Sequence, residues 1–368
     1  MFSKMKIVYL VNHFAEYGGI QRMLDHKINA LIKHTDSEIV LVTRFQNNRE
    51  YLYDSYKKTK KYDLNINSEN SFFSSISNSI NFYFSIKKII NSEKPDIIIT
   101  TLTSYYALVL PFIKKEVPKI VEFHSTAKTI KSGNWKYKKY FYQMYNSVVV
   151  LNNDEKREYS LTNTIVIPNF IYVEKNIEFL DFNFRKKTII SAGRLESVKQ
   201  FDHLILAWKN IYNNHKDWII EIYGDGTKKN ELSQLILENE LQDSIQLKGN
   251  TNNLNSIMRN ASIYCMTSKT DCFPMVLLEA KFNGLPTISY DCPYGPKNII
   301  KANNDGIIVQ NNDINALSAS LAELINDNKI REKMSKNAFV NFYEYSSLNV
   351  IQIWISLFNQ LVLNNDEN

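Results

Sequence analysis

The fold is decided most clearly by residues 188–202, TIISAGRLESVKQFD. The β-branched and small residues at 188–192 predict a buried strand, and the glycine that follows predicts its end. Apolar periodicity resumes at Phe201 and predicts a helix over 201–212. A strand, a glycine-containing loop and a helix in this order form the unit that builds parallel sheets covered by helices.

The same unit recurs along almost the whole chain. Because strands alternate with helical patterns, we expect parallel sheets covered on both faces. A length of 368 residues suits two such domains. We therefore predict an α/β protein with two facing, doubly wound, Rossmann-like domains. The predicted strands are 6–12, 39–44, 96–100, 119–123, 147–151 and 165–168, then 188–192, 218–223, 245–248, 262–266, 287–290 and 306–309.

Domain boundaries follow from the spacing of these two series. The connector begins at the Pro168-Asn169 turn, so we predict an N-terminal domain over 1–170 and a C-terminal domain over 171–342. The segment 343–368 contains an amphipathic pattern, and we expect it to form a helix that packs back on the first domain. Residues 46–75 are polar with weak periodicity and predict a long surface insertion.

The cysteines and the N-terminus indicate the compartment. Cys265, Cys272 and Cys292 form no CxxC pair and have no nearby histidine, which argues against a disulfide framework or a zinc site. Buried or half-buried thiols in a reducing compartment are the simpler interpretation. The first residues do not form a signal peptide pattern, and no transmembrane span is expected. We expect a cytoplasmic protein.

Positive charge is concentrated in the N-terminal half. The net charge is +6, and residues 1–170 carry 24 Lys/Arg against 15 Asp/Glu. Lysines and aromatics interleave over 128–142, which suits an anionic membrane surface or a phosphate-bearing acceptor. A solvated helix face with core aromatics is an equal alternative. No recognised binding motif accompanies the charge, so we expect no nucleic acid partner.

Gly18 and Gly19 stand between the first predicted strand and the first predicted helix. Glycines there let the backbone approach a ligand, and the N-terminus of a helix offers N–H donors to a phosphate. The spacing is not GxGxxG, so the usual dinucleotide fingerprint is absent. A tight turn without a ligand is the alternative.

Two cations follow the strand at 188–192. Arg194 and Lys199 lie in the loop after Gly193 and in the entrance to the next helix. Cations are normally favoured at helix C-termini, so their place at a helix entrance needs a reason. A bound diphosphate would supply one. An exposed loop with ordinary salt bridges is the alternative.

The most specific segment is residues 271–280, DCFPMVLLEA. Asp271 falls on the loop after a strand, and Glu279 falls inside the apolar helix that this loop feeds. A carboxylate among leucines and alanine costs free energy unless it is paired, and a ribose diol is a fitting partner. Alternatively, Glu279 lies on the wet face of the helix and pairs with Lys281 or solvent.

Taken together, these segments resemble the retaining glycosyltransferases of family GT4, which have the GT-B fold, and in particular those that build bacterial surface polysaccharides. The resemblance covers essentially the whole chain and is strongest over 191–309. Its matching pieces, in chain order, are 18–19, 167–169, 193–199, 223–226, 271–279 and 283–288.

The resemblance implies roles for individual residues. Arg194 and Lys199 would hold the donor diphosphate, Glu279 the ribose, and Asp271 the transferred sugar, while His124 matches the active-site histidine near that sugar. The residues implied in catalysis are His124, Arg194, Lys199 and Asp271. The residues implied in donor binding are Gly18, Gly19, Gly193, Arg194, Lys199, Gly224, Asp271, Phe273, Pro274, Met275, Val276 and Glu279.

The resemblance also implies a reaction. A hexose or N-acetylhexosamine would pass from a UDP-sugar to a glycan or undecaprenyl-diphosphate-linked acceptor, with retention and with neither metal nor other cofactor. The enzyme would work in O-antigen or capsule synthesis, in the cytoplasm or peripherally at the inner face of the membrane. Asp271-Cys272 stands where the family usually has Glu-Gly. A sugar-nucleotide epimerase and a non-catalytic nucleotide-binding scaffold are the alternatives.

Overall fold

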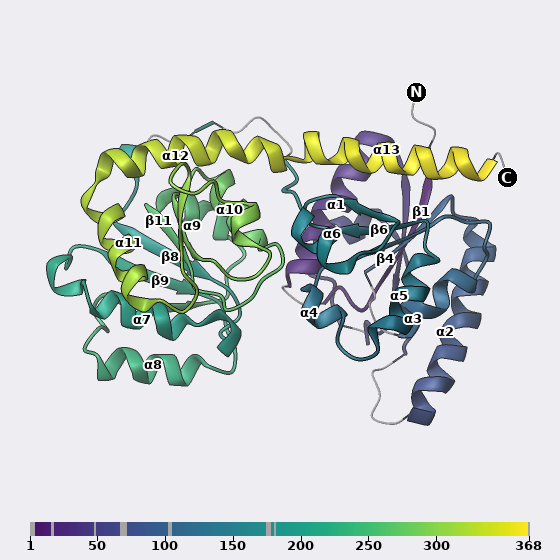
Figure 1. The fold of residues 1–368 in the computed structure, drawn as a ribbon, viewed down its shortest axis with the longest axis horizontal. Helices are drawn as coiled ribbons and strands as arrows, with labels where there is room; N and C mark the ends of the chain where they lie inside the picture. The colour runs from purple at the N-terminus through teal and green to yellow at the C-terminus, as the bar shows by residue number, and fades with distance from the viewer. Residues whose placement is uncertain are drawn as a thin grey trace. The chain divides into compact units, whose positions relative to one another are not determined.

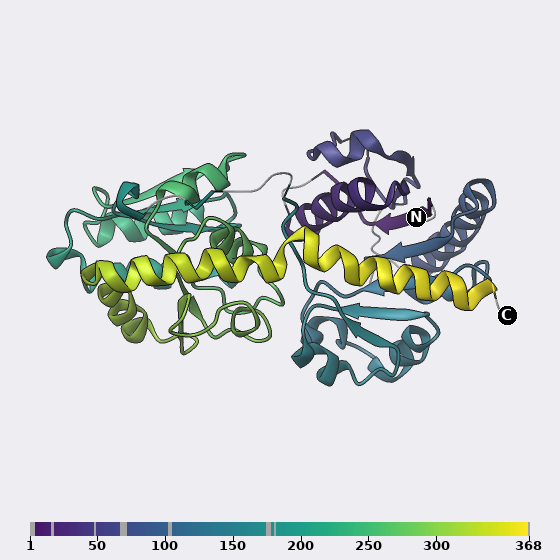
Figure 2. The ribbon, with the colours of Figure 1, turned by 90° about the horizontal axis from the view of Figure 1, so that it is seen from above.

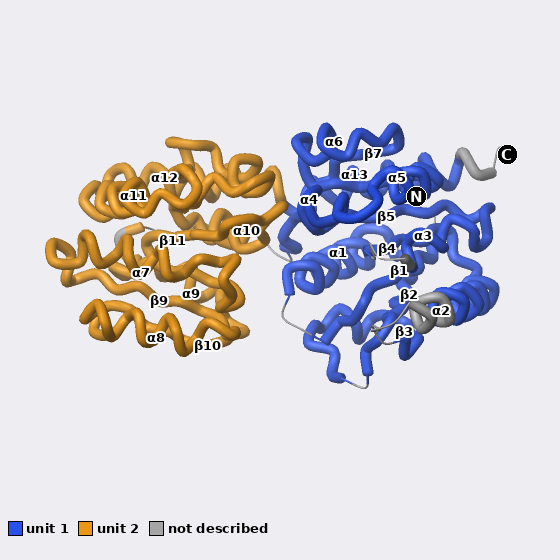
Figure 3. Tube along the Cα trace, turned by 60° about the horizontal axis from the view of Figure 1, so that its bottom comes forward, with its two compact units in different colours: residues 1–173, 346–368 blue, residues 174–345 orange. Residues whose placement is uncertain are grey.

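The computed structural model describes residues 4–15, 18–47, 49–66, 72–101, 105–173, 178–179 and 182–366. The chain divides into two compact units (Figure 3). Unit 1 comprises Met1–Val173 and Ser346–Asn368, and unit 2 comprises Glu174–Tyr345. These boundaries lie three residues beyond those expected from the sequence.

Unit 1 contains a seven-stranded sheet with the order β3-β2-β1-β4-β5-β6-β7, in which every neighbouring pair is parallel. Helices cover the sheet (Figure 1). Its strands are β1 (Lys6–Val11), β2 (Glu38–Thr43), β3 (Lys60–Asp63), β4 (Ile97–Thr100), β5 (Lys119–Glu122), β6 (Ser147–Val150) and β7 (Thr164–Val166). Its helices are α1 (Gly19–Thr35), α2 (Phe72–Glu93), α3 (Tyr105–Val109), α4 (Ala127–Ile130), α5 (Trp135–Gln143), α6 (Asn153–Tyr159) and α13 (Ser347–Asp366), with 3₁₀ turns η1 (Asp54–Lys58) and η2 (Leu110–Phe112).

Unit 2 contains a six-stranded, fully parallel sheet with the order β10-β9-β8-β11-β12-β13. Its strands are β8 (Thr188–Ala192), β9 (Ile219–Tyr223), β10 (Ile245–Gly249), β11 (Ile263–Met266), β12 (Thr287–Tyr290) and β13 (Gly306–Val309). Its helices are α7 (Phe201–Lys209), α8 (Lys229–Glu238), α9 (Leu254–Asn260), α10 (Met275–Phe282), α11 (Ile314–Asn326) and α12 (Asn328–Phe342). Its 3₁₀ turns are η3 (Phe182–Phe184), η4 (Ser197–Lys199), η5 (Tyr212–Asn214), η6 (Pro296–Asn298) and η7 (Tyr343–Tyr345).

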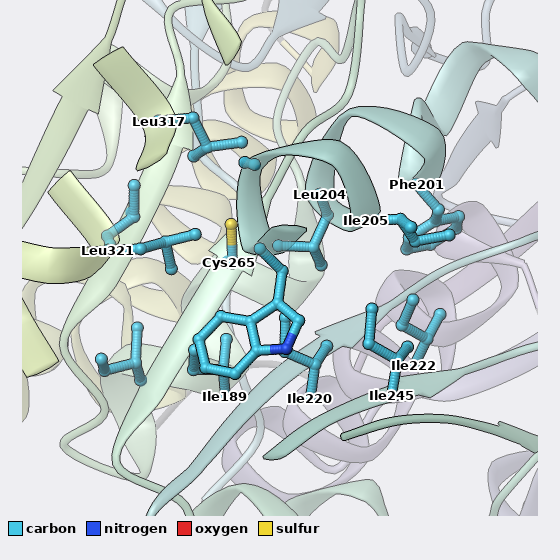
Figure 4. Close-up of a cluster of buried hydrophobic side chains, with 14 of the residues drawn as sticks. Ile189, Phe201, Leu204, Ile205, Ile220, Ile222, Ile245, Cys265, Leu317 and Leu321 are labelled. Atoms are coloured by element: carbon cyan, nitrogen blue, oxygen red, sulfur yellow. The ribbon is translucent and has the colours of Figure 1, made fainter. Parts of the chain in front are cut away.

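The core of unit 2 lies between this sheet and the helices that cover it. Side chains of α7 and α11 pack on the central strands, where Leu204 and Leu317 are fully buried (Figure 4). Cys265 on β11 belongs to the same cluster. Strands buried on both faces read as continuous apolar runs, which explains why the sequence pattern located them.

One expectation for unit 1 was wrong. Residues 46–75 are not only a surface insertion, because they contain η1 and the edge strand β3, which pairs with β2. The β3 sequence, Lys60-Lys61-Tyr62-Asp63, is half-buried or exposed throughout. An edge strand that carries charged side chains shows no apolar alternation, so the sequence pattern did not reveal it. Residues 48 and 67–71 of this range lie outside the described residues.

The C-terminal helix belongs to unit 1, as expected. It packs on α1 (Figures 1 and 2). Its buried residues include Val350, Ile351, Trp354 and Phe358. Hydrogen bonds also tie its start to the segment that leaves unit 1, since the Ser347 amide donates to the Ile171 carbonyl.

Within the described residues, the helices are too short or too polar to cross a lipid bilayer.

Candidate active site

The ligand-binding edge of unit 2 follows from its strand order. Because all strands are parallel, their carboxyl ends share one edge, and the chain direction across the sheet reverses between β8 and β11. Ligands of doubly wound sheets bind at such a reversal, beyond the carboxyl ends of the strands. Gly193, Arg194 and Lys199 follow β8, and Asp271 follows β11. The structure therefore brings these predicted residues to one place.

Two glycines let the loops after β8 and β9 touch. Gly224 has φ +135°, and a Cβ atom there would lie 1.9 Å from the Gly193 carbonyl oxygen. Backbone hydrogen bonds hold the two loops together, from the Gly193 amide to the Tyr223 carbonyl at 3.0 Å and from the Leu195 amide to the Asp225 carbonyl at 2.9 Å. Gly224 thus sets the path of the loop that carries Arg194.

Lys199 and Asp271 form an ion pair at the reversal point. Lys199 Nζ donates to Asp271 Oδ2 at 2.9 Å, and the two side chains are 22% and 19% exposed. The turn that carries Lys199 is held by Thr267, whose hydroxyl donates to the Lys199 carbonyl at 2.8 Å. A lysine ammonium has three N–H donors, so the pair with Asp271 leaves donor capacity for an anion.

Arg194 differs from Lys199 in its surroundings, because its side chain is exposed. Lys199 is half-buried, and a Cβ atom at Gly193 would meet its methylenes at 3.5 Å. The methylenes of Lys199 therefore pack over Gly193. The site has one cation held by packing and one that extends into solvent.

The helix α10 begins at the loop that carries Asp271. Pro274 is its N-cap residue, and the side chains of Phe273, Pro274 and Met275 are buried, while that of Val276 is half-buried. Because these side chains are mostly buried, we expect any donor binding here to use the backbone N–H groups of Phe273, Met275 and Val276, since proline has none. The first N–H groups of a helix have no partner within the helix and favour anions.

Glu279 on α10 is 5% exposed, so the alternative that placed it on a wet helix face is wrong. The partner suggested for it there, Lys281, is also buried and pairs with Asp305 instead. Its expected role, accepting hydrogen bonds from a ribose diol, stays a prediction.

A second strand-end segment supports the Asp271 loop. Asp271 forms a parallel β-bridge with Tyr294, and a Cβ atom at Gly295 would lie 2.7 Å from the Asp271 carbonyl oxygen. Cys272 is half-buried, whereas Cys265 and Cys292 are buried, and burial raises the pKa of each of these two thiols to about 12. The prediction of buried or half-buried thiols is confirmed.

The predicted residues of unit 1 lie at the carboxyl ends of its strands. Gly18 is the N-cap residue of α1 after β1, and a Cβ atom there would lie 2.2 Å from the Gln21 side-chain oxygen. A Cβ atom at Gly19 would meet nothing within 4 Å. His124 follows β5, and β4 separates β5 from β1 in the sheet.

Sequence reasoning missed the group behind His124. Its Nε2 atom lies 3.0 Å from Glu122 Oε2, and Lys27 Nζ donates to the same oxygen at 2.5 Å. The Tyr9 hydroxyl donates to Glu122 Oε1 at 2.9 Å. A glutamate inside an apolar strand was the available signal, since such a carboxylate must be paired.

The lysine-rich and aromatic segment at 128–142 has features of both interpretations that the sequence left open, a surface for an anionic partner and a helix with core aromatics. Tyr142 is buried, and Trp135 contacts its ring. On the other side of α5, Tyr137 and Tyr140 are 68% and 65% exposed, and Lys136 is exposed as well. One face of α5 is therefore core, and the other presents aromatic rings beside a positive charge.

In the part of the chain that the structure describes, no group of three or more His, Cys, Asp or Glu residues is arranged to hold a metal ion.

Two family models match the chain, one over each half. A family model described as Glycosyltransferase Family 4 matches residues 17–175, and one described as Glycosyl transferases group 1 matches residues 173–340. The amylovoran biosynthesis glycosyltransferase AmsD of Erwinia amylovora is 30% identical over 244 residues, which are 64% of this chain and 68% of that protein.

Two further proteins match over nearly their full length. An α-1,4-N-acetyl-D-galactosaminyltransferase of Campylobacter jejuni, whose name includes a GalNAc-containing glycan on PP-undecaprenol, is 25% identical over 96% of this chain and 98% of its own. A mutant of TarM from S. aureus, solved with UDP, fondaparinux and α-GlcNAc-glycerol, superposes with a TM-score of 0.82 at 16% identity, over 96% of this chain and 100% of that one.

The two parallel α/β units and the superposition define a GT-B fold. The chain belongs to glycosyltransferase family 4. It is thus a glycosyltransferase. These matches favour glycosyl transfer over the epimerase and the non-catalytic scaffold, which the sequence left as alternatives.

Proposed function

We propose that this enzyme transfers a hexose or N-acetylhexosamine from a UDP-sugar to a glycan acceptor, with retention of anomeric configuration, in bacterial surface polysaccharide synthesis of the O-antigen or capsule type. The observation that carries the proposal is the meeting of Lys199, Asp271 and the start of α10 at the reversal point of unit 2. Relatives named for amylovoran biosynthesis and for transfer to an undecaprenol-linked glycan support the biological setting.

In the proposed mechanism, unit 2 stabilises the leaving diphosphate. Arg194 and Lys199 supply positive charge, and the N-terminal amides of α10 supply aligned N–H donors. Preorganised donors of this kind stabilise charge that develops in the transition state. Asp271 accepts hydrogen bonds from hydroxyls of the transferred sugar, and the buried Glu279 accepts from the ribose diol.

The acceptor attacks the same face of the sugar that the diphosphate leaves. The new glycosidic bond forms as the bond between the anomeric carbon and the diphosphate oxygen breaks, and that oxygen takes the proton of the acceptor hydroxyl. This route needs no enzyme nucleophile, and we propose that it needs no metal because the two cations carry the positive charge. His124 of unit 1 is proposed to contact the transferred sugar, and Gly18 and Gly19 the diphosphate.

A nucleotide-sugar binding panel tests the donor site. UDP-, GDP-, ADP- and CMP-sugars are titrated in EDTA into wild type, Arg194→Ala and the control Lys336→Ala, an exposed cation of unit 2 that pairs with Glu332. A ligand at 100 times its dissociation constant stabilises by about 2.7 kcal/mol. UDP-sugars should stabilise wild type and the control but not Arg194→Ala. No binding without added divalent metal would refute metal independence.

Product analysis tests the stereochemistry and the need for an acceptor. Proton NMR of the glycoside made from an α-linked donor should show an α-linkage, and a β-linkage would refute retention. Conversion of the donor to another sugar nucleotide without acceptor would indicate an epimerase instead.

We also propose that the enzyme works at the cytoplasmic face of the cell membrane on an undecaprenyl-diphosphate-linked acceptor. The exposed face of α5 supports this, because Tyr137 and Tyr140 stand beside Lys136, and aromatic rings with basic side chains suit an anionic lipid surface.

Vesicle flotation tests the membrane proposal. Wild type should float with vesicles that contain anionic lipid, and the double variant Tyr137→Ser/Tyr140→Ser should not. Leu237→Ser, at a position in unit 2 that is 63% exposed, is the matched control and should float like wild type. Equal flotation of all three proteins, or of none, would remove α5 from the proposal.

A further inference from the structure

A buried group of charged side chains lies behind His124 in unit 1. Glu122, the last residue of β5, is 1% exposed and accepts hydrogen bonds from Lys27, His124 and Tyr9. Lys27 comes from α1 and is 2% exposed. Its ammonium lies 3.6 Å from the ring centroid of Trp354 on α13. Side chains from β1, from α1 and from the segment after β5 thus converge on Glu122.

Such a group is a poor way to stabilise a core. Removing a lysine and a glutamate from water costs several kcal/mol for each ion, and apolar side chains of similar volume often stabilise a protein as well or better. The indole of Trp354 offsets part of that cost through a cation–π contact with Lys27. The arrangement is better explained by what it does to His124, whose side chain is itself only 5% exposed.

The proton positions in the group follow from its charges. Burial alone would raise the pKa of Glu122, but the Lys27 charge and the hydrogen bonds from His124 and Lys27 outweigh burial and lower this pKa to about 2. Glu122 is therefore ionised at neutral pH. An ionised carboxylate only accepts hydrogen bonds, so the proton between Glu122 and His124 belongs to Nε2 of His124.

We propose that Glu122 is a positioning residue that holds His124 in one orientation and in its Nε2–H tautomer, and that Lys27 keeps Glu122 in the ionised form that this requires. The inference rests on the proposed function, in which His124 contacts the transferred sugar. A neutral ring in this tautomer has its acceptor lone pair on Nδ1. The sugar then meets a ring of defined orientation and hydrogen-bonding polarity.

Two double variants separate this role from general stability. Lys27→Met/Glu122→Gln removes both charges with little change in volume, so it should fold even where a single substitution would leave one buried charge unpaired. The matched control is Lys281→Met/Asp305→Asn in unit 2, another buried ion pair with side chains 2% and 1% exposed. Urea unfolding verifies that both proteins fold.

Two measurements are made on each protein. Nitrogen-15 NMR of histidine-labelled protein gives the tautomer of His124, whose signals are assigned by their loss in His124→Asn. Steady-state kinetics gives kcat and KM for the donor. Wild type should show the Nε2–H tautomer. In Lys27→Met/Glu122→Gln the tautomers should mix, and kcat should fall by about 10- to 100-fold while the donor KM changes by less than about 3-fold.

Three results would overturn the inference. They are an Nδ1–H tautomer in wild type, an unchanged tautomer and kcat in Lys27→Met/Glu122→Gln, and an equal loss of kcat in the control. The NMR measurement needs no substrate, so it decides the role of Glu122 even if wild type transfers no sugar. A wild-type protein that transfers no sugar would refute the proposed function instead.

Discussion

Replacing Gly224 with alanine tests how the loops after β8 and β9 depend on each other. Gly224 has φ +135°, a conformation that side-chain-bearing residues rarely adopt, and an added Cβ would lie 1.9 Å from the Gly193 carbonyl oxygen. Because Cβ contacts under 3.0 Å are essentially never seen, this carbonyl must retreat by about 1 Å.

The cost can be worked out from the contacts that this movement disturbs. Backbone strain of this kind costs about 1–3 kcal/mol. The hydrogen bonds from the Gly193 amide to Tyr223 and from the Gly224 amide to Gly249 each contribute about 1 kcal/mol. We therefore expect Gly224→Ala to lower the free energy of unfolding of unit 2 by about 3–5 kcal/mol.

Gly249→Ala is the matched control. Gly249 also has positive φ, +72°, but a Cβ atom there would meet nothing within 4 Å. It should cost only the strain of a left-handed residue, about 1–2 kcal/mol. The difference between the two variants isolates the contact between the loops.

Urea unfolding followed by tryptophan fluorescence measures both costs, since Trp208 and Trp218 lie in the core of unit 2. Binding of a UDP-sugar should weaken by at least about tenfold in Gly224→Ala, because a shift of about 1 Å moves the loop that carries Arg194. Equal destabilisation by the two alanines, or unchanged donor affinity in Gly224→Ala, would refute this reasoning.

Two further predictions concern buried titratable groups. Burial raises the pKa of Glu155 to about 8. Between about pH 4.5 and 8 the folded state therefore holds a proton that the unfolded state has released. Wild-type stability falls as pH rises through this range. Relative to wild type, Glu155→Gln should therefore raise the free energy of unfolding by about 2–4 kcal/mol at pH 9 and by little at pH 5. Urea denaturation measures both values, and an equal gain at the two pH values would contradict the raised pKa of Glu155. Among the thiols, half-buried Cys272 should react with maleimide at pH 8 much faster than buried Cys265 and Cys292, and a bound UDP-sugar should slow its modification; mass spectrometry of the labelled peptides would expose the opposite order.

Local sequence patterns located most of the elements. The strands at 188–192, 287–290 and 306–309 have the predicted bounds. Each is a run whose side-chain period is set by its own backbone geometry, so a short window contains the signal. The edge strand β3 lacked that signal because only one of its edges pairs and most of its side chains are charged.

The residues of the candidate site were predictable only in part. Lys199 and Asp271 stood out because charged side chains at strand ends are unusual. Together with Gly193, they also matched the motifs of a family. Their roles toward a donor stay predictions. The sequence also singled out Glu279, but only the structure showed that it is buried, since a helical pattern that is apolar all round does not reveal which side faces solvent.

The sequence by itself determined that the chain forms two strand–helix series with glycines and charged residues at strand ends. Only the tertiary structure decided which side chains meet. Lys199 and Asp271 are 72 positions apart, and Lys27 and Glu122 are 95 apart. Such pairs form because parallel strands bring their carboxyl ends to one edge and because a helix packs over a strand. These contacts are set by the packing of whole elements, and no short segment of the chain encodes them.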